Sequence, residues 1–340
     1  MWTETTRLVA PISLLLSVLA CSTAGAHDAA PDREPLSLDQ MADALGIDPE
    51  APVKVQELGD GFYVLFGLGG NVLVSSGEDG VLIIDDQFPM IMPRLRAAMK
   101  ERGDTRIDFV VNTHWHFDHA DGNQILGAEG TWLVSQANSR RMLLEDQLIN
   151  LGPMTFRQEA YPPHALPDIT FDTTMQFHFN GERIDLLHVG PAHTTGDAAV
   201  YFHGHDTVHM GDVFNLAGYP FVDAGNGGTL DGMLAFSESV LETIGPKTIV
   251  VPGHGPVADR AALVDYVAML RHVHAHLTAM IAAGGTLEEA LEAGITARWD
   301  EEKGDPASFI ERSWTSLTHR YLGPGSAARP GTASSQQPKH

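Results

Sequence analysis

Residues 113–123 read THWHFDHADGN, and the sequence just before them, Ile107–Thr113, is apolar enough to form a buried strand. Four side chains that can bind a metal stand within six residues of this stretch: His114, His116, Asp118 and His119. They lie on the loop that leaves the strand. Because alternate residues of an extended segment point the same way, His114 and His116 can converge on one ion. Asp118 and His119 then face a second position.

Three further residues of ligand type follow predicted strands or glycines. His193 precedes T-T-G-D, Asp212 lies in HMGDVF, and His254 lies in VVPGHGP. Glycine allows the backbone to approach a ligand closely, so these positions suit a binding site. Imidazole and carboxylate together favour zinc, with iron or manganese as alternatives.

The order of apolar segments and turn signals predicts hairpins that alternate with helices, twice over. Strands are expected at Val53–Leu58, Phe62–Phe66, Asn71–Ser75, Val81–Asp85 and Ile107–Thr113, and then at Met175–Phe179, Arg183–His188, Ala198–Phe202, Thr207–Met210 and Thr248–Val251. Helices are expected at Met92–Glu101, Leu230–Ile244, Val257–Ala283 and Leu287–Tyr321. This plan fits two mixed sheets with helices outside. Residues Asn150–Pro167, with four prolines, are expected to form a long loop.

Taken together, H-x-H-x-D-H, a later His before T-x-G-D, Gly-Asp after a strand, and P-G-H-G resemble the metallo-β-lactamase superfamily. The resemblance runs over roughly residues 53–275. It implies an α/β fold, an αββα sandwich of two mixed sheets with helices on both outer faces and the metals at one edge.

The resemblance also implies a role for each residue of the pattern. His114, His116 and His193 would hold a first zinc ion, and Asp118, His119 and His254 a second. Asp212 resembles the bridging aspartate of thioesterase-like and general hydrolase members. Asp85, at the end of a predicted strand, matches an aspartate placed close to the ligands.

One branch of that superfamily is excluded by the sequence. Its β-lactamases carry a cysteine ligand where this chain has Asp212, and an arginine where it has His119. Cys21 is the sole cysteine of the chain and stands outside the motifs, so no thiolate is available for the site.

The ends of the chain are predicted to stand apart from the domain. Residues 1–26 resemble a signal peptide, with an apolar run of 13 residues at Leu8–Ala20 and a cleavage site at Ala24–Ala26. Residues 27–52 form a leader, 53–322 the catalytic domain with its C-terminal helices, and 323–340 a disordered tail. Export, most simply to the periplasm, is therefore expected, with a lipid anchor at Cys21 as the alternative.

Composition limits the partners. A net charge of −23 disfavours nucleic acid, whose phosphates bind clustered lysine and arginine. No later stretch reaches 18 apolar residues, so we expect no transmembrane segment. A small-molecule substrate is expected, and the oligomeric state is left open.

Three function classes remain. The first is a hydrolase in which two zinc ions lower the pKa of a shared water, so that the metal-bound hydroxide cleaves an amide, ester, thioester or lactone while Asp118 orients it. A periplasmic β-lactamase is one form of this class. The second is an iron-dependent oxidoreductase similar to the sulfur dioxygenases. His116 disfavours the di-iron flavoprotein branch, which has glutamate there. The third is a metal carrier without catalysis.

Substrate choice would depend on three stretches: Phe88–Pro93, Asn150–Pro167 and Gly218–Gly228. The third, GYPFVDAGNGG, contains no lysine or arginine. A cation that could bind the carboxylate of a β-lactam is therefore not expected near it. This favours a broad or non-lactam hydrolase.

Overall fold

The computed structural model describes residues 50–152 and 154–318, together with positions 35, 36, 40 and 48. The predicted signal peptide, the tail predicted to be disordered and most of the predicted leader lie outside the described residues. Within the described residues, no helix combines the length and the apolar character needed to cross a membrane.

The first sheet has the strand order β1-β2-β3-β4-β5-β6-β9. Its strands are β1 (Lys54–Gly59), β2 (Phe62–Phe66), β3 (Val72–Gly77), β4 (Gly80–Ile84), β5 (Phe109–Asn112), β6 (Trp132–Gln136) and β9 (Ile169–Phe171). The first four strands form an antiparallel meander, and β4, β5, β6 and β9 run parallel. The carboxyl ends of the parallel strands therefore meet at one edge of the sheet.

The second sheet has the order β10-β11-β12-β13-β14-β15. Its strands are β10 (Thr174–Phe179), β11 (Glu182–Leu187), β12 (Ala199–Phe202), β13 (Thr207–His209), β14 (Ile249–Val251) and β15 (Ala258–Asp259). Neighbours are antiparallel except β13 and β14, which are parallel. A separate hairpin pairs β7 (Gln147–Asn150) with β8 (Thr155–Gln158). Both large sheets are mixed, as the sequence predicts.

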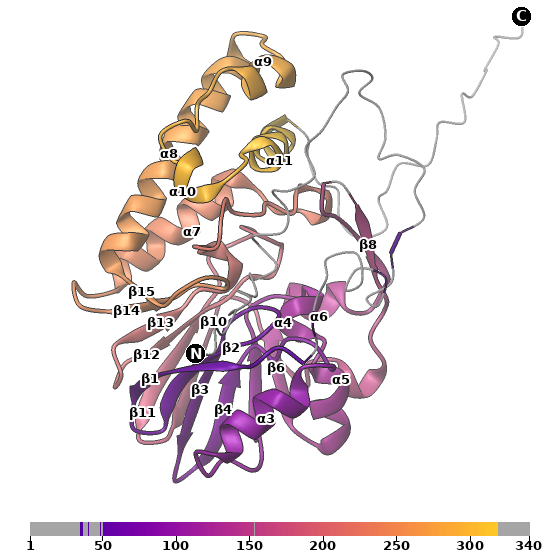
Figure 1. Cartoon of the computed structure of the whole chain (residues 1–340), viewed down its shortest axis with the longest axis vertical. Coiled ribbons are helices and arrows are strands. Elements are labelled where there is room, and N and C mark those ends of the chain that lie inside the picture. Colours follow the sequence, from indigo (N-terminus) through magenta and orange to yellow (C-terminus); the bar gives the residue numbers. More distant parts are fainter. Residues whose placement is uncertain (1–34, 37–39, 41–47, 49, 153, 319–340) are drawn as a thin grey trace, which may run out of the picture.

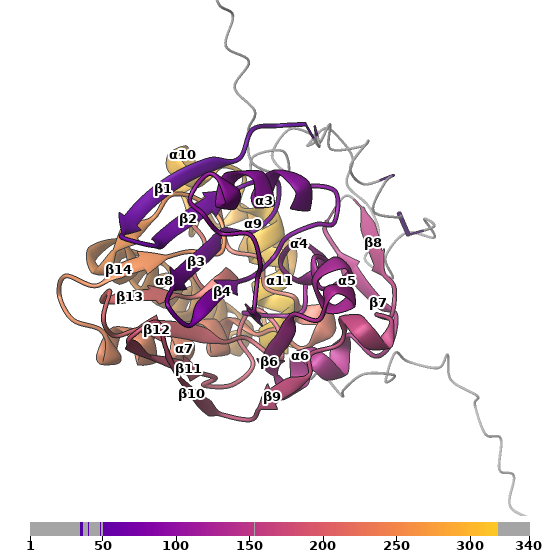
Figure 2. The ribbon, with the colours of Figure 1, turned by 90° about the horizontal axis from the view of Figure 1, so that it is seen from below.

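Helices cover the outer faces of the two sheets (Figures 1 and 2). The helices of the described residues are α3 (Met92–Lys100), α4 (Phe117–Ala120), α5 (Asn123–Leu126), α6 (Ala137–Met142), α7 (Leu230–Thr243), α8 (Arg260–Ala282), α9 (Leu287–Glu292), α10 (Asp300–Lys303) and α11 (Ala307–Thr318), of which α11 packs on α7, α8 and α9. Leu95 and Met99 of α3 pack on the first sheet, whereas α7 and α8 pack on the second. The result is the predicted αββα sandwich.

Alternating side chains of the strands build three hydrophobic cores. In β4, Val81 and Ile83 face α3, while Leu82 and Ile84 face the second sheet. In β12, Val200 meets the first sheet from the other side. The central strands β2 to β5 are thus covered on both faces, which explains why they are apolar along most of their length.

Two predicted segments differ in the structure. Residues 150–167, expected to be a loop, contain β8 and the short turn η2 (Pro163–Ala165), because β8 finds its partner in β7 just upstream. The expected helix 287–321 is divided into α9, α10 and α11 over its described part, with Gly294 and Gly304 at positive φ between them. Glycine at positive φ ends a helix.

We expect Leu82→Ala to lower the free energy of unfolding by about 2–5 kcal/mol, because it leaves a cavity between the sheets. Leu144→Ala, at a side chain that is 47% exposed, is the matched control and should change it by less than about 0.5 kcal/mol. Urea denaturation measures both. Equal losses would contradict the placement of Leu82 in the inter-sheet core.

Candidate metal centre

The seven predicted ligands come together at one edge of the sandwich, although they belong to both sheets. His114 and His116 follow β5, and α4 carries Asp118 and His119. The other three lie in loops of the second sheet: His193 before β12, Asp212 after β13, and His254 after β14. Parallel pairing of β4 with β5 and of β13 with β14 places these loops at the same edge.

His114, His116 and His193 form a first group, each with a ring nitrogen within 4.8 Å of the others. The Nε2 atom of His193 is 2.9 Å from Nδ1 of His116. His114 presents Nε2, which is buried and has no hydrogen-bond partner among the described residues. Three imidazole nitrogens thus face one point.

A second group consists of Asp118, His119 and His254. His254 Nε2 lies 3.1 Å from Oδ2 of Asp118 and 3.2 Å from Nε2 of His119. Asp118 comes from the short helix α4 and His254 from the P-G-H-G loop. Here the donors are two imidazoles and one carboxylate.

Asp212 lies between the two groups. Its Oδ1 atom is 3.2 Å from Nε2 of His119 and 3.5 Å from Nε2 of His254, whereas Oδ2 is 3.8 Å from Nε2 of His193. Gly253 makes this position available, because a Cβ there would lie 1.9 Å from Asp212 Oδ1. One carboxylate therefore faces both groups, one oxygen to each.

The nitrogens that point away from the centre are held by other residues. Nε2–H of His116 donates to Asp223 (2.9 Å), and Nδ1–H of His193 donates to the Phe221 carbonyl (2.5 Å). Nδ1–H of His119 donates to Asp85 (2.7 Å). These bonds leave the inward nitrogens as lone pairs, as metal-binding histidines require.

Asp85 connects two parts of the motif. Its carboxylate accepts hydrogen bonds from the backbone N–H and the hydroxyl of Thr113, at 2.7 and 2.8 Å, besides that from His119. The hydroxyl of Thr113 in turn accepts from Nδ1 of His114, 3.1 Å away. Asp85 is fully buried and adopts φ 63°, a costly conformation for aspartate. It occupies the position that the resemblance implies.

The electrostatics of the cluster favour a bound cation. Burial opposes protonation of His119, but Asp212, Asp118 and Asp85 outweigh it and raise its pKa well above the ordinary value. Likewise, Asp212 and Asp118 overcome burial and raise the pKa of His254 to about 9. The carboxylates therefore demand positive charge here. His114 behaves oppositely, since burial and its histidine neighbours lower its pKa. It offers a neutral imidazole, which suits a metal.

Apart from Asp85, the sequence did not reveal the residues that hydrogen-bond to the ligands from outside the centre. Asp223 is 1% exposed and accepts from His116 and from Asn226. Asp197 accepts from both the backbone and the hydroxyl of Thr194 and so shapes the turn after His193. An aspartate in T-x-G-D or in a glycine-rich loop predicts a turn, but the local sequence does not indicate which side chain will hydrogen-bond to it.

Of the stretches expected to determine substrate choice, residues 218–228 contact the metal ligands, whereas Phe88 lies in the core. Phe221, in residues 218–228, lies against the rings of His116 and His193, with centroids 5.9 and 5.7 Å apart. Phe88 is buried against Phe117 and supports α4 from behind. Residues 218–228 themselves hold no lysine or arginine, but a cation from elsewhere in the chain lies close to them. Arg312 of α11 lies over Phe221, with its Cζ 4.2 Å from the ring centroid, because tertiary folding returns the C-terminal helix to this loop.

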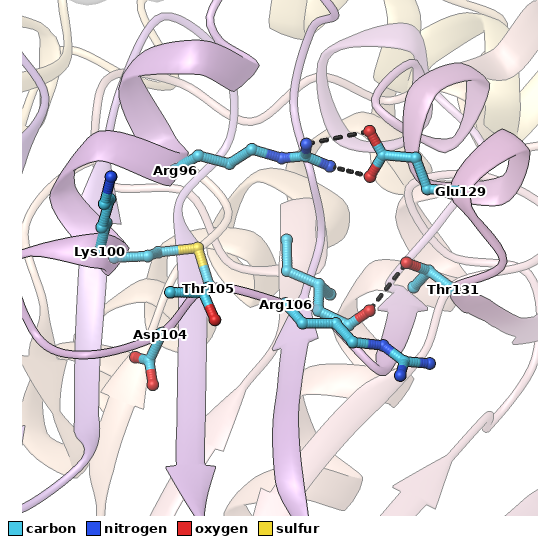
Figure 3. A pocket seen from close by; sticks show the side chains of 9 residues that line it. Arg96, Lys100, Asp104, Thr105, Arg106, Glu129 and Thr131 are labelled. Atoms are coloured by element: carbon cyan, nitrogen blue, oxygen red, sulfur yellow. Dashed lines mark hydrogen bonds and ion pairs between the residues drawn. The ribbon is translucent and has the colours of Figure 1, made fainter.

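A pocket of about 400 Å³ lies elsewhere, at the amino ends of β5 and β6 and thus at the opposite edge of the first sheet. Figure 3 shows its charged side chains, among which Arg96 and Glu129 pair with each other. It is separate from the histidine cluster.

Comparison with known proteins agrees with the geometry. A profile of the metallo-beta-lactamase superfamily matches residues 63–254. The cytoplasmic hydroxyacylglutathione hydrolase of Saccharomyces cerevisiae is 26% identical over 200 residues, or 56% of this chain and 64% of its own length. The mitochondrial enzyme of the same yeast is 27% identical over 181 residues, 51% of this chain and 55% of its own. The chain thus spans less than two thirds of these relatives.

Two further matches have the word metallo-beta-lactamase in their names. The type 2 metallo-beta-lactamase of Bacillus cereus is 22% identical over 214 residues, 62% of this chain and 77% of its own length. The solved structure of a metallo-beta-lactamase from Pontibacter korlensis superposes with a TM-score of 0.52 at 19% identity, covering 64% of this chain and 99% of that one. At such identity the superposition supports the fold.

We expect the purified protein to bind about two equivalents of zinc, because seven ligands exceed the four that one tetrahedral ion uses. Replacing both His119 and His254 with alanine should leave about one, held by the first group. Elemental analysis after dialysis measures the ratio. Two ions retained by the double variant would show that the second group is not a zinc site.

Proposed function

The chain belongs to the metallo-β-lactamase superfamily, and from that premise we propose that it is a dinuclear zinc hydrolase of carboxylic acid derivatives. The observation that carries the proposal is the position of Asp212. Its two oxygens face separate groups of imidazoles, at 3.2 Å from His119 and 3.8 Å from His193. A carboxylate in that position suits a bridge between two cations.

Zinc is favoured by the donor set of five imidazoles and two carboxylates, without thiolate. His114, His116 and His193 would hold one ion, and Asp118, His119 and His254 the other, with Asp212 shared. Iron uses the same donors, so metal analysis of protein purified without added metal decides between a hydrolase and an iron-dependent oxidoreductase.

When bound, the two ions would supply a water of lowered pKa and would polarise the carbonyl of the substrate. Asp118 is suited to accept a proton from that water. Its Oδ2 atom faces His254 and His119, which leaves Oδ1 as the oxygen for the water. The side chain is 14% exposed, so Oδ1 can accept a proton as the water oxygen bonds to the carbonyl carbon. The bond from that carbon to the leaving group breaks, and the leaving group takes up the proton.

An ester, thioester or lactone is the proposed substrate, ahead of a β-lactam. Asp212 stands where the cysteine-ligand lactamases carry their thiolate. The yeast relatives are named hydroxyacylglutathione hydrolases, which cleave a thioester according to that name. Because Arg312 lies close to residues 218–228, the lack of a cation within that stretch does not count against a β-lactam substrate. The preference for an ester, thioester or lactone rests on Asp212 and on the yeast relatives. Export of the enzyme is also proposed, from residues 1–26 alone.

Asp118→Asn should lower kcat at least about 100-fold, since it keeps the shape of the side chain but removes the proton acceptor. Zinc content must be measured in the same preparation, because Asp118 is also a proposed ligand. Near-normal turnover by a variant with two zinc ions would show that the carboxylate is not needed.

Steady-state kinetics on a penicillin, a cephalosporin, a carbapenem, an acyl-lactone and a thioester test the substrate ranking. We expect the lactone or thioester to be the better substrate and any lactam turnover to be weak. A kcat/KM for a lactam in the range of about 10⁶–10⁸ M⁻¹s⁻¹, as good enzymes reach, would reverse the ranking. Hydrolysis of none of the five by the zinc-loaded protein would contradict the hydrolase itself.

A further inference from the structure

The C-terminal helices lie beyond the part of the chain that matches the superfamily, which ends at residue 254. They nevertheless contact the loop beside the metal centre. The short turn η4 (Ala224–Asn226) within that loop touches both β7 and α11. We refer to residues 218–228 as the site loop.

Both ends of the site loop are fastened to the C-terminal segment. Near its start, the Tyr219 ring stacks on Phe309 of α11, with centroids 5.4 Å apart and planes at 13°. The Tyr219 hydroxyl donates to Asp300, 2.7 Å away. Just after its end, the backbone N–H of Leu230 donates to the Ser316 hydroxyl at 3.2 Å.

Arg312 fixes the middle of the loop. Its guanidinium lies over the Phe221 ring at 4.2 Å and donates to the Asn150 carbonyl and the Ser308 hydroxyl. The residue is 7% exposed, and burial lowers the pKa of its guanidinium in spite of the charges of Asp223 and Glu311. Burial of a cation is costly, and the cation–π contact, the two hydrogen bonds and these carboxylate charges offset that cost.

The loop that Arg312 holds is attached directly to two proposed zinc ligands. The Phe221 carbonyl accepts from His193 Nδ1, and the Asp223 carboxylate accepts from His116 Nε2. The backbone of Asp223 also donates to the His193 carbonyl, 3.0 Å away. A shift of the loop would therefore reorient both imidazoles.

We propose that Arg312 is a positioning residue of the metal centre, through which helix α11 holds Phe221 and the site loop so that His116 and His193 keep their orientation toward the first zinc ion. The C-terminal helices would thus help to position the metal ligands, in addition to covering the second sheet. This inference rests on the proposed zinc site, but it makes a separate prediction about metal affinity.

The test compares Arg312→Met with Arg312→Lys and with Arg260→Met. Arg260 also donates to a backbone carbonyl, that of Leu241, but lies away from the site loop, so its variant is the matched control. Zinc affinity is measured by competition with a chelator, and the geometry of the site by the absorption spectrum of the cobalt-substituted protein. Tyr219→Phe, which removes only the hydroxyl that contacts Asp300 and the Thr296 carbonyl, serves if Arg312→Met does not fold.

We expect Arg312→Met to weaken the zinc bound by the first group about 10–100-fold and to alter the cobalt spectrum, as loss of outer contacts to ligands does. Arg312→Lys should recover part of the affinity because it keeps a cation over Phe221, and Arg260→Met should match the wild type. Tyr219→Phe should show a smaller loss in the same direction.

Unchanged zinc affinity and an unchanged cobalt spectrum in Arg312→Met would overturn the proposal. If that variant instead showed a raised KM for an acidic substrate at wild-type affinity for zinc, Arg312 would bind substrate and would not position the ligands. Failure of the wild-type protein to bind zinc would refute the proposed function and the positioning role together, and so differs from both results.

Discussion

The burial of carboxylates among histidines is the constraint on which the rest of this structure depends. Asp212 lies in a nearly closed environment, and its pKa is held well below the usual range by His254 and His119 in spite of burial. Such a group is stable only beside positive charge. The same carboxylates raise the pKa values of His119 and His254. The proposed pair of divalent cations would satisfy the whole set at once.

The architecture of the sandwich follows from the need to bring these groups to one place. Each sheet alone supplies an incomplete set: the first provides His114, His116, Asp118 and His119, and the second His193, Asp212 and His254. The inter-sheet core of Leu82, Val111 and Val200 fixes the two sheets relative to one another. Its packing therefore determines the distances between ligands that are far apart in the chain. Close-packed cores resist small displacements, so the site inherits their rigidity.

Around the ligands, a second set of residues holds the outward nitrogens. Asp85 serves His119 and, through Thr113, His114, while the site loop serves His116 and His193. Asp85 and the site loop are themselves held in place by different parts of the fold. Asp85 belongs to the end of a central strand, whereas the site loop depends on β7 and on the C-terminal helices for its position. The first group of ligands is thus tied to the part of the chain beyond residue 254, where the match to the superfamily ends.

The sequence by itself determined the fold class, the edge at which the ligands gather and the identity of the seven candidate ligands. It could do so because four of them stand within six residues after an apolar strand, and the others carry glycine-rich motifs that are local. Tertiary structure alone decided that Asp223 is the partner of His116, 107 residues away, and that Arg312 lies over Phe221. An aspartate in a loop and an arginine in an amphipathic helix are ordinary surface residues in any local pattern. Only the packing of α11 against the site loop gives them partners, because burial and pairing are properties of the folded chain.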